Sequence, residues 1–372
     1  MKRVRDDPEA LDFVRHMKPK QEFFDPTILP TEMWRHIFSF IPQDLHAVFL
    51  LVCHAWKGSV AEGYDLSTET ICSLGYTALL KWKIRDYSGL WISSRYAFVA
   101  ARGGHWDMLI FMGQYTEITG WTCVGAAAGG QLEVLKKLND RKILWYNKDN
   151  RVCEVAAENG HLHVLQWATD NGFTWHGDCK KVAKNGHLHV LKWAKQRGQE
   201  LLRVCHGAAK GGHLEVLQWA REHGCAWDEE TCNRAARGGH LDVLQWLRKH
   251  GCPWDEETCY AAARGGHLET LKWARENGCP WNERTCYAAA RGGHLETLKW
   301  AREHGCPWNE DTCCLAAAGG HLEVLQWARE QDCPWNEGTC SVAAMNGHLK
   351  VLKWAREHGC PWDEDMCWAA AE

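Results

Sequence analysis

The chain has 372 residues, of which 45% are hydrophobic and 24% charged, and its formal net charge at pH 7 is −4. This balance lacks the basic excess typical of nucleic-acid-binding proteins. We find no apolar run long enough to cross a membrane and no secretory signal peptide, so we expect a cytoplasmic protein without a membrane partner. The basic start, residues 1–5, leaves the nucleus as an alternative location.

The first part of the chain predicts a tail followed by a helical hairpin. Residues 1–25 are charged and aperiodic, and we predict a flexible tail there. Apolar residues recur at helical spacing over Leu29–Ile41, and a second apolar segment, Leu45–Trp56, follows a proline. Two such short helices within residues 26–62 leave surplus apolar surface, which indicates a docking element for a partner.

This hairpin resembles an F-box. It carries the Leu-Pro-x-Glu opening, the Ile-Phe-x-Phe-Ile block, the Asp-Leu pair and the Val-Cys-x-x-Trp ending in the order of that family. The resemblance implies binding to a Skp1-like protein within a cullin–RING ubiquitin ligase. By position it assigns the Skp1 contact to Leu29, Pro30, Ile37, Phe38, Leu45, Val52 and Trp56. The alternative is that the hairpin only caps the structure that follows.

Residues 63–372 form a repeat array. Each copy is counted at its anchor, the residue after a central glycine, and the anchors recur every 26 or 27 residues with one step of 30. The anchors are His105, Gln131, His161, His187, His213, His240, His267, His294, His321 and His348. A degenerate copy begins at Gly75 and brings the number of copies to about eleven. A fixed period of this size indicates a solenoid.

One copy predicts a pair of helices. Asp255–Arg264 has an acidic start and an alanine-rich body, Gly265 and Gly266 interrupt it, and His267–Asn277 has leucine and tryptophan at helical spacing. We expect neighbouring copies to share one core. We also expect tryptophan burial to dominate stability, at roughly 3–5 kcal/mol for each buried Trp→Ala change.

The copy resembles an ankyrin repeat. The segment Ala262–Glu269 matches the Ala-Ala-x-x-Gly-His-x-Glu stretch of that family, but the period is shorter and the residues of the projecting β-hairpin are missing. We therefore predict an all-α fold, with N-terminal F-box helices followed by an α-solenoid of about eleven short (26–30 residue) ankyrin-like helix-turn-helix repeats. The combination resembles proteins of amoeba-infecting giant DNA viruses, which implies the host cytoplasm as the location.

The 19 cysteines fall mostly at two positions of each repeat. They are interpreted as small buried core residues in a reducing compartment. The alternative is a zinc or redox ladder involving the anchor histidines. A zinc ion needs four convergent ligands, which one cysteine per helix does not supply locally. We therefore predict no metal site and no cofactor.

The positions that vary between repeats predict where a target binds. By the ankyrin resemblance they lie on the first helix and its following turn. Five consecutive repeats carry a basic residue two before the central glycine, which predicts a stripe about 40 Å long. The predicted target-binding residues are Lys184, Lys210, Arg237, Arg264 and Arg291, with Tyr260 and Tyr287 near one end. We expect an acidic protein segment as the ligand.

The alternative for this stripe is a solvated face neutralised by acids in the first helical turns. Candidates are Asp228, Glu229, Asp255 and Glu256, and the same acids argue against nucleic acid as the ligand. The regular anchor histidines are interpreted as structural. No set of residues has the pattern of a catalytic site, so we predict that the protein is not an enzyme.

The function predicted from the sequence is a substrate-recruiting adaptor of a Skp1–cullin–F-box ubiquitin ligase, with the repeats binding a target protein. One alternative is a non-catalytic interaction scaffold whose F-box-like hairpin is only a cap. Another is a Cys/His metal or redox protein.

Overall fold

The structure is a computed structural model that describes residues 67–86, 92–143 and 151–362. The predicted tail and F-box, with all seven predicted Skp1-contacting residues, lie outside the described residues. The chain divides into two compact units, Met1–Gly125 and Ala126–Glu372.

The helices of the first unit form consecutive pairs. They are α5 (Thr68–Leu74), α6 (Thr77–Asp86), α7 (Ser94–Arg102), α8 (Trp106–Met112) and the start of α9 (Gly120–Ala128), which runs across the boundary between the units. The helix α5 packs on α6 and on α7, and α7 packs on α8. The degenerate copy predicted from Gly75 is therefore a helix pair like the others.

The second unit continues the same series of helix pairs. Its helices are α10 (Leu132–Asp140), α11 (Arg151–Glu158), α12 (Leu162–Asp170), α13 (Cys179–Lys184), α14 (Leu188–Gln196), α15 (Val204–Gly211), α16 (Leu214–Glu222), α17 (Glu229–Gly238), α18 (Leu241–Lys249), α19 (Glu256–Arg264), α20 (Leu268–Glu276), α21 (Glu283–Gly292), α22 (Leu295–Glu303), α23 (Glu310–Ala318), α24 (Leu322–Glu330), α25 (Glu337–Met345) and α26 (Leu349–Glu357).

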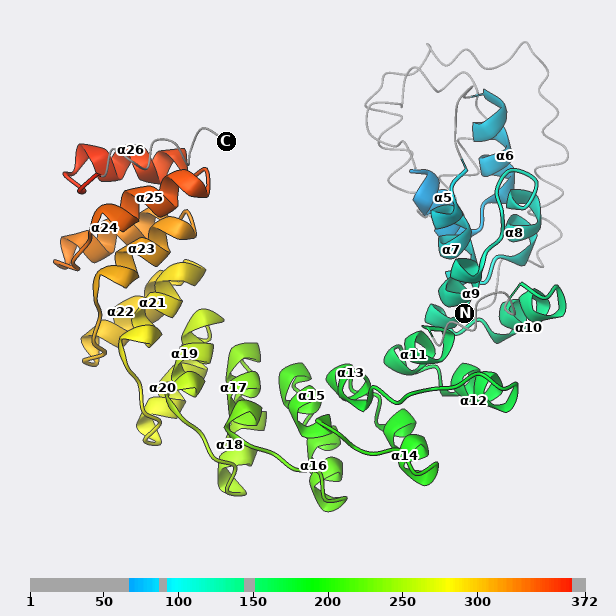
Figure 1. Cartoon of the computed structure of the whole chain (residues 1–372), viewed down its shortest axis with the longest axis horizontal. Helices are drawn as coiled ribbons and strands as arrows, with labels where there is room; N and C mark the ends of the chain where they lie inside the picture. Colours follow the sequence, from blue (N-terminus) through cyan, green and yellow to red (C-terminus); the bar gives the residue numbers. More distant parts are fainter. Residues whose placement is uncertain (1–66, 87–91, 144–150, 363–372) are drawn as a thin grey trace, which may run out of the picture. The chain divides into compact units, whose positions relative to one another are not determined.

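The predicted fold class is confirmed. Over the ranges that the structure describes there are 22 helices in eleven pairs and no strand. Within the second unit, each odd-numbered helix from α11 to α23 packs against the next odd-numbered helix, and each from α11 to α25 packs against its own even-numbered partner. Figure 1 shows these odd-numbered first helices in one row and the even-numbered second helices in another.

Capping residues fix the ends of each helix. Asp255 is the N-cap of α19, and its carboxylate accepts a hydrogen bond of 3.1 Å from the backbone N–H of Glu257. The helix stops at Gly265, and Gly266 has a φ of 72°, a left-handed conformation that suits glycine. The second helix, α20, ends before Gly278, whose φ is 82°. These boundaries agree with the prediction.

The anchor histidines join successive repeats. His294 Nε2 donates to the backbone carbonyl of Arg264 at 3.2 Å, thirty residues earlier. Its ring also covers Gly266, where an added Cβ would lie 2.4 Å from the ring nitrogen Nδ1. The same bond recurs, at 2.7 to 3.2 Å, from His105, His161, His213, His240, His267, His321 and His348. Their predicted structural role is confirmed by these contacts.

The core is built from small and aliphatic side chains, and the tryptophans flank it. In the repeat of α19 and α20, Cys259, Ala262, Leu271 and Ala274 are fully buried. All twelve repeat tryptophans from Trp219 to Trp362 are half-buried. The expectation that tryptophan burial dominates stability stays a prediction, and in these repeats it rests on rings that keep part of their surface in water.

The tryptophans also contact the loops between repeats. Arg275 lies over Trp281, with 4.2 Å from its guanidinium carbon to the ring centroid, and donates a hydrogen bond to the carbonyl of Cys279. Trp281 in turn meets the edge of Trp300 with ring centroids 5.9 Å apart. The arginine–tryptophan contact recurs in six consecutive loops, so these rings help to hold the loops in place.

The cysteines pack inside the repeats, as predicted. Cys259 and Cys279 are fully buried, and the Cys279 thiol donates to the carbonyl of Asp255 at 3.3 Å. Burial raises the pKa of the Cys123 thiol to about 12, which keeps it protonated at neutral pH. In the described ranges no group of three or more His, Cys, Asp or Glu side chains is placed to hold a metal ion.

No helix in the described part of the chain combines the length and apolar character that crossing a bilayer requires.

Candidate functional site

The five predicted basic residues lie at equivalent places on successive first helices. Each occupies the last or next-to-last position of its helix: Lys184 on α13, Lys210 on α15, Arg237 on α17, Arg264 on α19 and Arg291 on α21. A cation is favoured at a helix C-terminus by the helix dipole. Because these first helices pack side by side, the five side chains form one row, called the basic row below.

The backbone of the basic row is held in place by the next repeat. The five carbonyls that accept the anchor-histidine bonds from His213 to His321 belong to the five row residues themselves. The backbone at each position is therefore fixed by a neighbouring repeat, while the side chain extends away from it. This arrangement gives a row of cations on a regular scaffold.

Four members of the basic row are available to a ligand. Lys184, Lys210, Arg237 and Arg291 are exposed, and none of them forms an ion pair with any other described residue. Arg264 differs, because it is half-buried and its Nη1 donates to the hydroxyl of Tyr260 at 3.1 Å. The row therefore presents four unpaired charges.

The acids proposed to neutralise the row make other contacts or none. Asp228 accepts a hydrogen bond of 2.7 Å from His206, and Asp255 caps its own helix. Burial raises the pKa of Asp228, but the hydrogen bond and charge of His206, together with the hydrogen bonds of Thr231, outweigh burial and hold that pKa below its usual value. Glu229 and Glu256 are exposed and form no ion pair within the described ranges. Direct neutralisation of the row is thus not seen.

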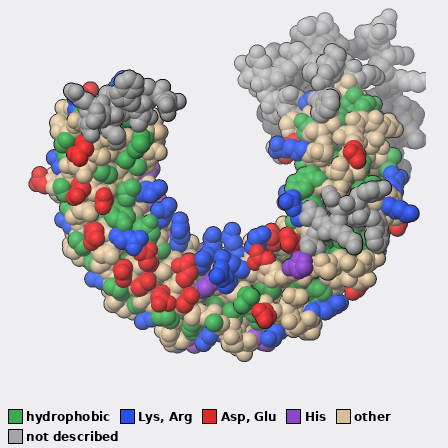
Figure 2. Space-filling view, in the orientation of Figure 1, with side chains coloured by type: hydrophobic (Ala, Val, Ile, Leu, Met, Phe, Trp, Pro, Cys, Tyr) green, Lys and Arg blue, Asp and Glu red, His purple; other side chains and the backbone are tan. Residues whose placement is uncertain are grey.

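Positive charge is concentrated toward one part of the row. The helices α13 and α15 have no acid in their first turn, whereas α17 and α19 each have two. Figure 2 shows Lys and Arg side chains gathered over α13 to α17. An acidic ligand would therefore meet the strongest attraction at this part of the second unit.

One recess, called the second-unit recess, lies at this place between α15, α17 and α19 and has a volume of about 550 Å³. It brings together three of the predicted target-binding residues: Lys210, Arg237 and Tyr260. The other predicted residues, Lys184, Arg264, Arg291 and Tyr287, do not line it. The structure thus gathers part of the predicted site into one concave place and leaves the rest along the row.

Two acids also line the second-unit recess, and each is paired with an arginine. Glu230 pairs with Arg234 at 2.8 Å, one helical turn away on α17. Glu257 pairs with Arg284 of the next repeat. Because both acids are already paired, Lys210 and Arg237 make the net charge of the recess positive. The recess therefore suits a carboxylate.

The two predicted tyrosines are partly engaged between repeats. Their rings meet edge to face with centroids 6.2 Å apart, and both are half-buried. The guanidinium of Arg284 lies 4.8 Å from the centroid of Tyr260, and its Nε donates to the hydroxyl of Tyr287 at 2.8 Å. Tyr260 therefore lines the recess, while Tyr287 contacts it from the neighbouring helix α21.

Sequence reasoning missed four residues of this site, although the signals were present. Glu230 and Arg234 stand four apart on one helix, a spacing typical of ion pairs. Glu257 and Arg284 occupy the same repeat position, two before the first-helix cysteine, with opposite charges in adjacent repeats. An alignment of the repeats by position would have placed each pair together.

Comparisons with known proteins find two similarities. Residues 205–248 and 259–302 match the family model of ankyrin repeats in many copies, and these segments contain most of α15–α22 and of the recess. The ankyrin repeat domain of human ASB11 is a solved structure similar to this chain, with 17% identity and a TM-score of 0.36, over 42% of this chain and 85% of that one. No curated protein matches the chain.

The match supports the ankyrin part of the predicted resemblance for these two segments, which are similar to ankyrin repeats.

Proposed function

We propose that this protein is a substrate-recruiting adaptor of a ubiquitin ligase of the Skp1–cullin–F-box type. Its ankyrin repeats hold an acidic segment of a target protein along the basic row, and residues 26–62 bind a Skp1-like protein. The adaptor brings target and ligase together and supplies no catalytic residue of its own.

The observation that supports target binding most is the set of four exposed, unpaired cations in the basic row. Lys210 and Arg237 also border the second-unit recess, where the acids are already paired. A row of like charges repels itself and is stabilised by a ligand of opposite charge. An extended acidic segment fits this spacing better than a compact anion, because the charges follow one another along stacked helices.

The support for ligase binding is the order of F-box motifs between Leu29 and Trp56. The alternative, an interaction scaffold in which this hairpin only caps the stack, explains the basic row equally well. The two functions differ in one property, which is binding to a Skp1-like protein.

Pull-down of a purified Skp1-like protein by the full chain separates them. The adaptor function predicts capture by the wild-type chain and loss of capture by the double variant Ile37→Asp with Phe38→Asp, while circular dichroism of the repeats stays unchanged. Absence of capture by the wild-type chain would leave the scaffold function.

The target-binding half is tested with a fluorescein-labelled peptide of alternating aspartate and glutamate. We expect the variant Lys210→Glu with Arg237→Glu to bind it about tenfold or more weakly at low salt, with binding in the wild type falling as salt screens the row. The control, Lys192→Glu with Lys249→Glu, makes the same charge change at exposed sites on second helices. Equal losses in both variants would show attraction to net charge alone, and the proposed row would be wrong.

A further inference from the structure

Six pairs of cysteines lie in contact within the described repeats of the second unit. In each pair a cysteine of the first helix and the loop cysteine twenty residues later form a hydrogen bond between their thiols. The pairs are Cys205–Cys225, Cys232–Cys252, Cys259–Cys279, Cys286–Cys306, Cys313–Cys333 and Cys340–Cys360. A disulfide forms when one thiol of such a pair reacts as a thiolate, so the charge around each loop cysteine decides which pair reacts.

The sulfur of Cys225 lies at the start of α15. The backbone N–H of Cys205, in the first turn of this helix, donates to the Cys225 Sγ at 3.4 Å, and the Cys205 Sγ lies 3.8 Å from the carbonyl oxygen of Cys225. Arg221 Nη1 donates to the same carbonyl at 2.9 Å. Like the other loop cysteines, Cys225 also lies beside a carbonyl of the preceding loop, that of Leu201 at 3.3 Å. A helix N-terminus favours a negative charge on this sulfur.

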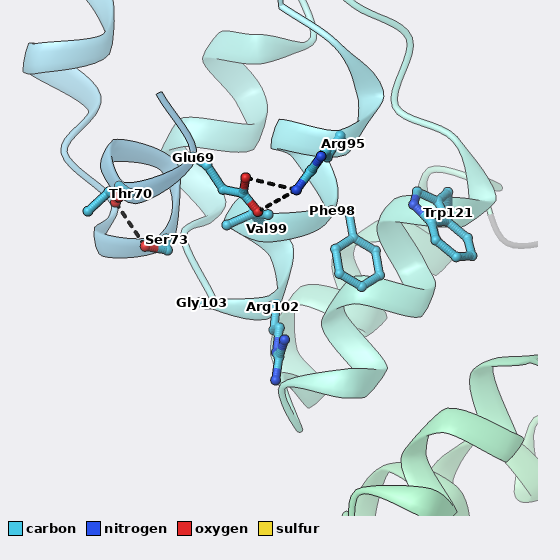
Figure 3. Close-up of a pocket in the computed structure, with 9 residues that line it drawn as sticks. All are labelled: Glu69, Thr70, Ser73, Arg95, Phe98, Val99, Arg102, Gly103 and Trp121. Carbon is cyan, nitrogen blue, oxygen red and sulfur yellow. Dashed lines mark hydrogen bonds and ion pairs between the residues drawn. The ribbon is translucent and has the colours of Figure 1, made fainter. Parts of the chain in front are cut away.

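The first helices of the other five pairs begin with acids. The helices α17, α19, α21, α23 and α25 each have at least one acid in the first turn. In the first unit α5 has the same feature, and its first-turn acid Glu69 pairs with Arg95 at 3.0 Å (Figure 3). The helix α15 has no acid in its first turn, and no described side chain caps it. A thiolate at the start of α15 therefore avoids the repulsion that Glu229 and Glu230 would exert at the start of α17.

The pKa values of the two thiols move apart. Hydrogen-bond donation by the Cys205 thiol lowers the pKa of Cys225, burial opposes it, and the backbone N–H groups of Cys205 and Val204 and the charge of Arg221 lower that pKa further. The same contact with Cys225, together with burial, raises the pKa of Cys205. By contrast, burial raises the pKa of Cys360, in the last described loop, to about 12. Cys225 is therefore the nucleophile of its pair, and Cys205 remains a thiol.

We propose that Cys225 and Cys205 form a modification site at which a hydroperoxide oxidises the two thiols to a disulfide. The sulfur of Cys225 attacks one oxygen of the hydroperoxide, the O–O bond breaks, and the leaving oxygen takes up a proton and departs as water or an alcohol. The sulfur of Cys205 then attacks the sulfenic sulfur of Cys225, and the thiol proton leaves with the hydroxyl group as water. The pair loses two electrons, and the hydroperoxide gains two.

The exposure of the sulfur selects a small oxidant. Cys225 is 5% exposed. The loop cysteines of the next four repeats are fully buried, namely Cys252, Cys279, Cys306 and Cys333. Hydrogen peroxide needs a narrow approach to the sulfur, whereas a larger oxidant, such as the disulfide of glutathione, needs more of its surface. The product joins the start of α15 to the loop before α17.

The test treats the reduced full chain with a limiting amount of hydrogen peroxide at pH 7 and then alkylates the remaining thiols. Tandem mass spectrometry of the digested chain should find the Cys205–Cys225 disulfide about tenfold or more above the matched Cys232–Cys252 disulfide, because only the first pair has a favoured thiolate. Dithiothreitol should reverse the product. Equal amounts of the two disulfides, or no disulfide between Cys205 and Cys225, would overturn the inference.

Two variants assign the order of the two sulfurs. Cys205→Ser keeps a hydrogen-bond donor but cannot form the disulfide, so a 1,3-diketone probe should label a sulfenic acid on Cys225. Cys225→Ser should leave Cys205 without label. The control Cys252→Ser should leave the Cys205–Cys225 disulfide at its wild-type level, and melting temperatures show that each variant is folded. Label on Cys205 in folded Cys225→Ser, equal to that on Cys225 in Cys205→Ser, would contradict Cys225 as the nucleophile.

Discussion

At the scale of single residues, the anchor histidine connects stability to the binding face. From His213 to His321, each ring covers a glycine of the preceding repeat and donates to the carbonyl of the basic-row residue there. The regular spacing predicted a structural role from the sequence alone. The partner was not predictable in this way, because a carbonyl thirty residues earlier becomes a neighbour only after the helices stack.

Replacing one anchor tests this connection. His267→Gln removes the bond of 3.1 Å to the carbonyl of Arg237 and the ring that covers Gly239. We expect a loss of about 1–3 kcal/mol in the free energy of unfolding, as for a partly buried polar group that loses its partner. The control is His223→Gln, which alters an exposed histidine bonded within its own helix. Equal losses in urea unfolding would contradict a special role for the anchor.

The lowered pKa values of two anchor histidines also predict how stability depends on pH. Burial lowers the pKa of His187 and of His294 below 6.5, helped by repulsion from His161, His189 and His213 near the first and from His267 and His321 near the second. The unfolded chain then binds protons more readily than the folded chain. Stability is therefore full above 6.5 and decreases as the pH falls below that value.

Thermal melting at pH 7.5 and pH 5.5 measures this effect in a range where most carboxylates remain ionised. We expect a lower melting temperature at pH 5.5, and a smaller difference between the two conditions in His294→Gln. A melting temperature that is equal or higher at pH 5.5 would contradict the prediction.

At the scale of elements, close packing of the first helices shapes the stack. The helix limits followed from the sequence, because an acidic cap, an alanine-rich body and paired glycines recur in each copy. The placement of the tryptophans did not follow, since helical spacing shows which residues share a face and not how far a neighbouring element covers them. These rings are half-buried beside the loops.

A close contact in the second unit predicts that replacing a helical glycine by alanine lowers stability. Gly207 on α15 faces α13, and a Cβ there would lie 2.1 Å from the carbonyl oxygen of Lys180. Gly207→Ala should destabilise the protein by about 1–3 kcal/mol through overpacking, although alanine favours helices. Ala261 has the same repeat position on α19. Ala261→Gly should lower the free energy of unfolding only by the difference in helix propensity, about 1 kcal/mol, together with any lost packing. Chemical denaturation of both variants checks this, and a stabilised Gly207→Ala would refute the contact.

At the scale of the whole molecule, the sequence predicted the array of eleven helix pairs and the basic row, because both depend on the period alone. The second-unit recess was not predicted. It is formed by residues of three first helices that come from three successive repeats, together with ion pairs such as Glu257 with Arg284. Only stacking shows which acids are already paired and which cations, such as Lys210, remain available.

The most direct test asks whether one chain bridges ligase and target. A Skp1-like protein is immobilised, the full chain is added, and retention of the labelled aspartate–glutamate peptide is measured. The wild type should retain chain and peptide, Ile37→Asp with Phe38→Asp should retain neither, and Lys210→Glu with Arg237→Glu should retain the chain without the peptide. Failure of the wild-type chain to bind the Skp1-like protein, or retention of the peptide by the Lys210 and Arg237 variant, would contradict the proposed adaptor.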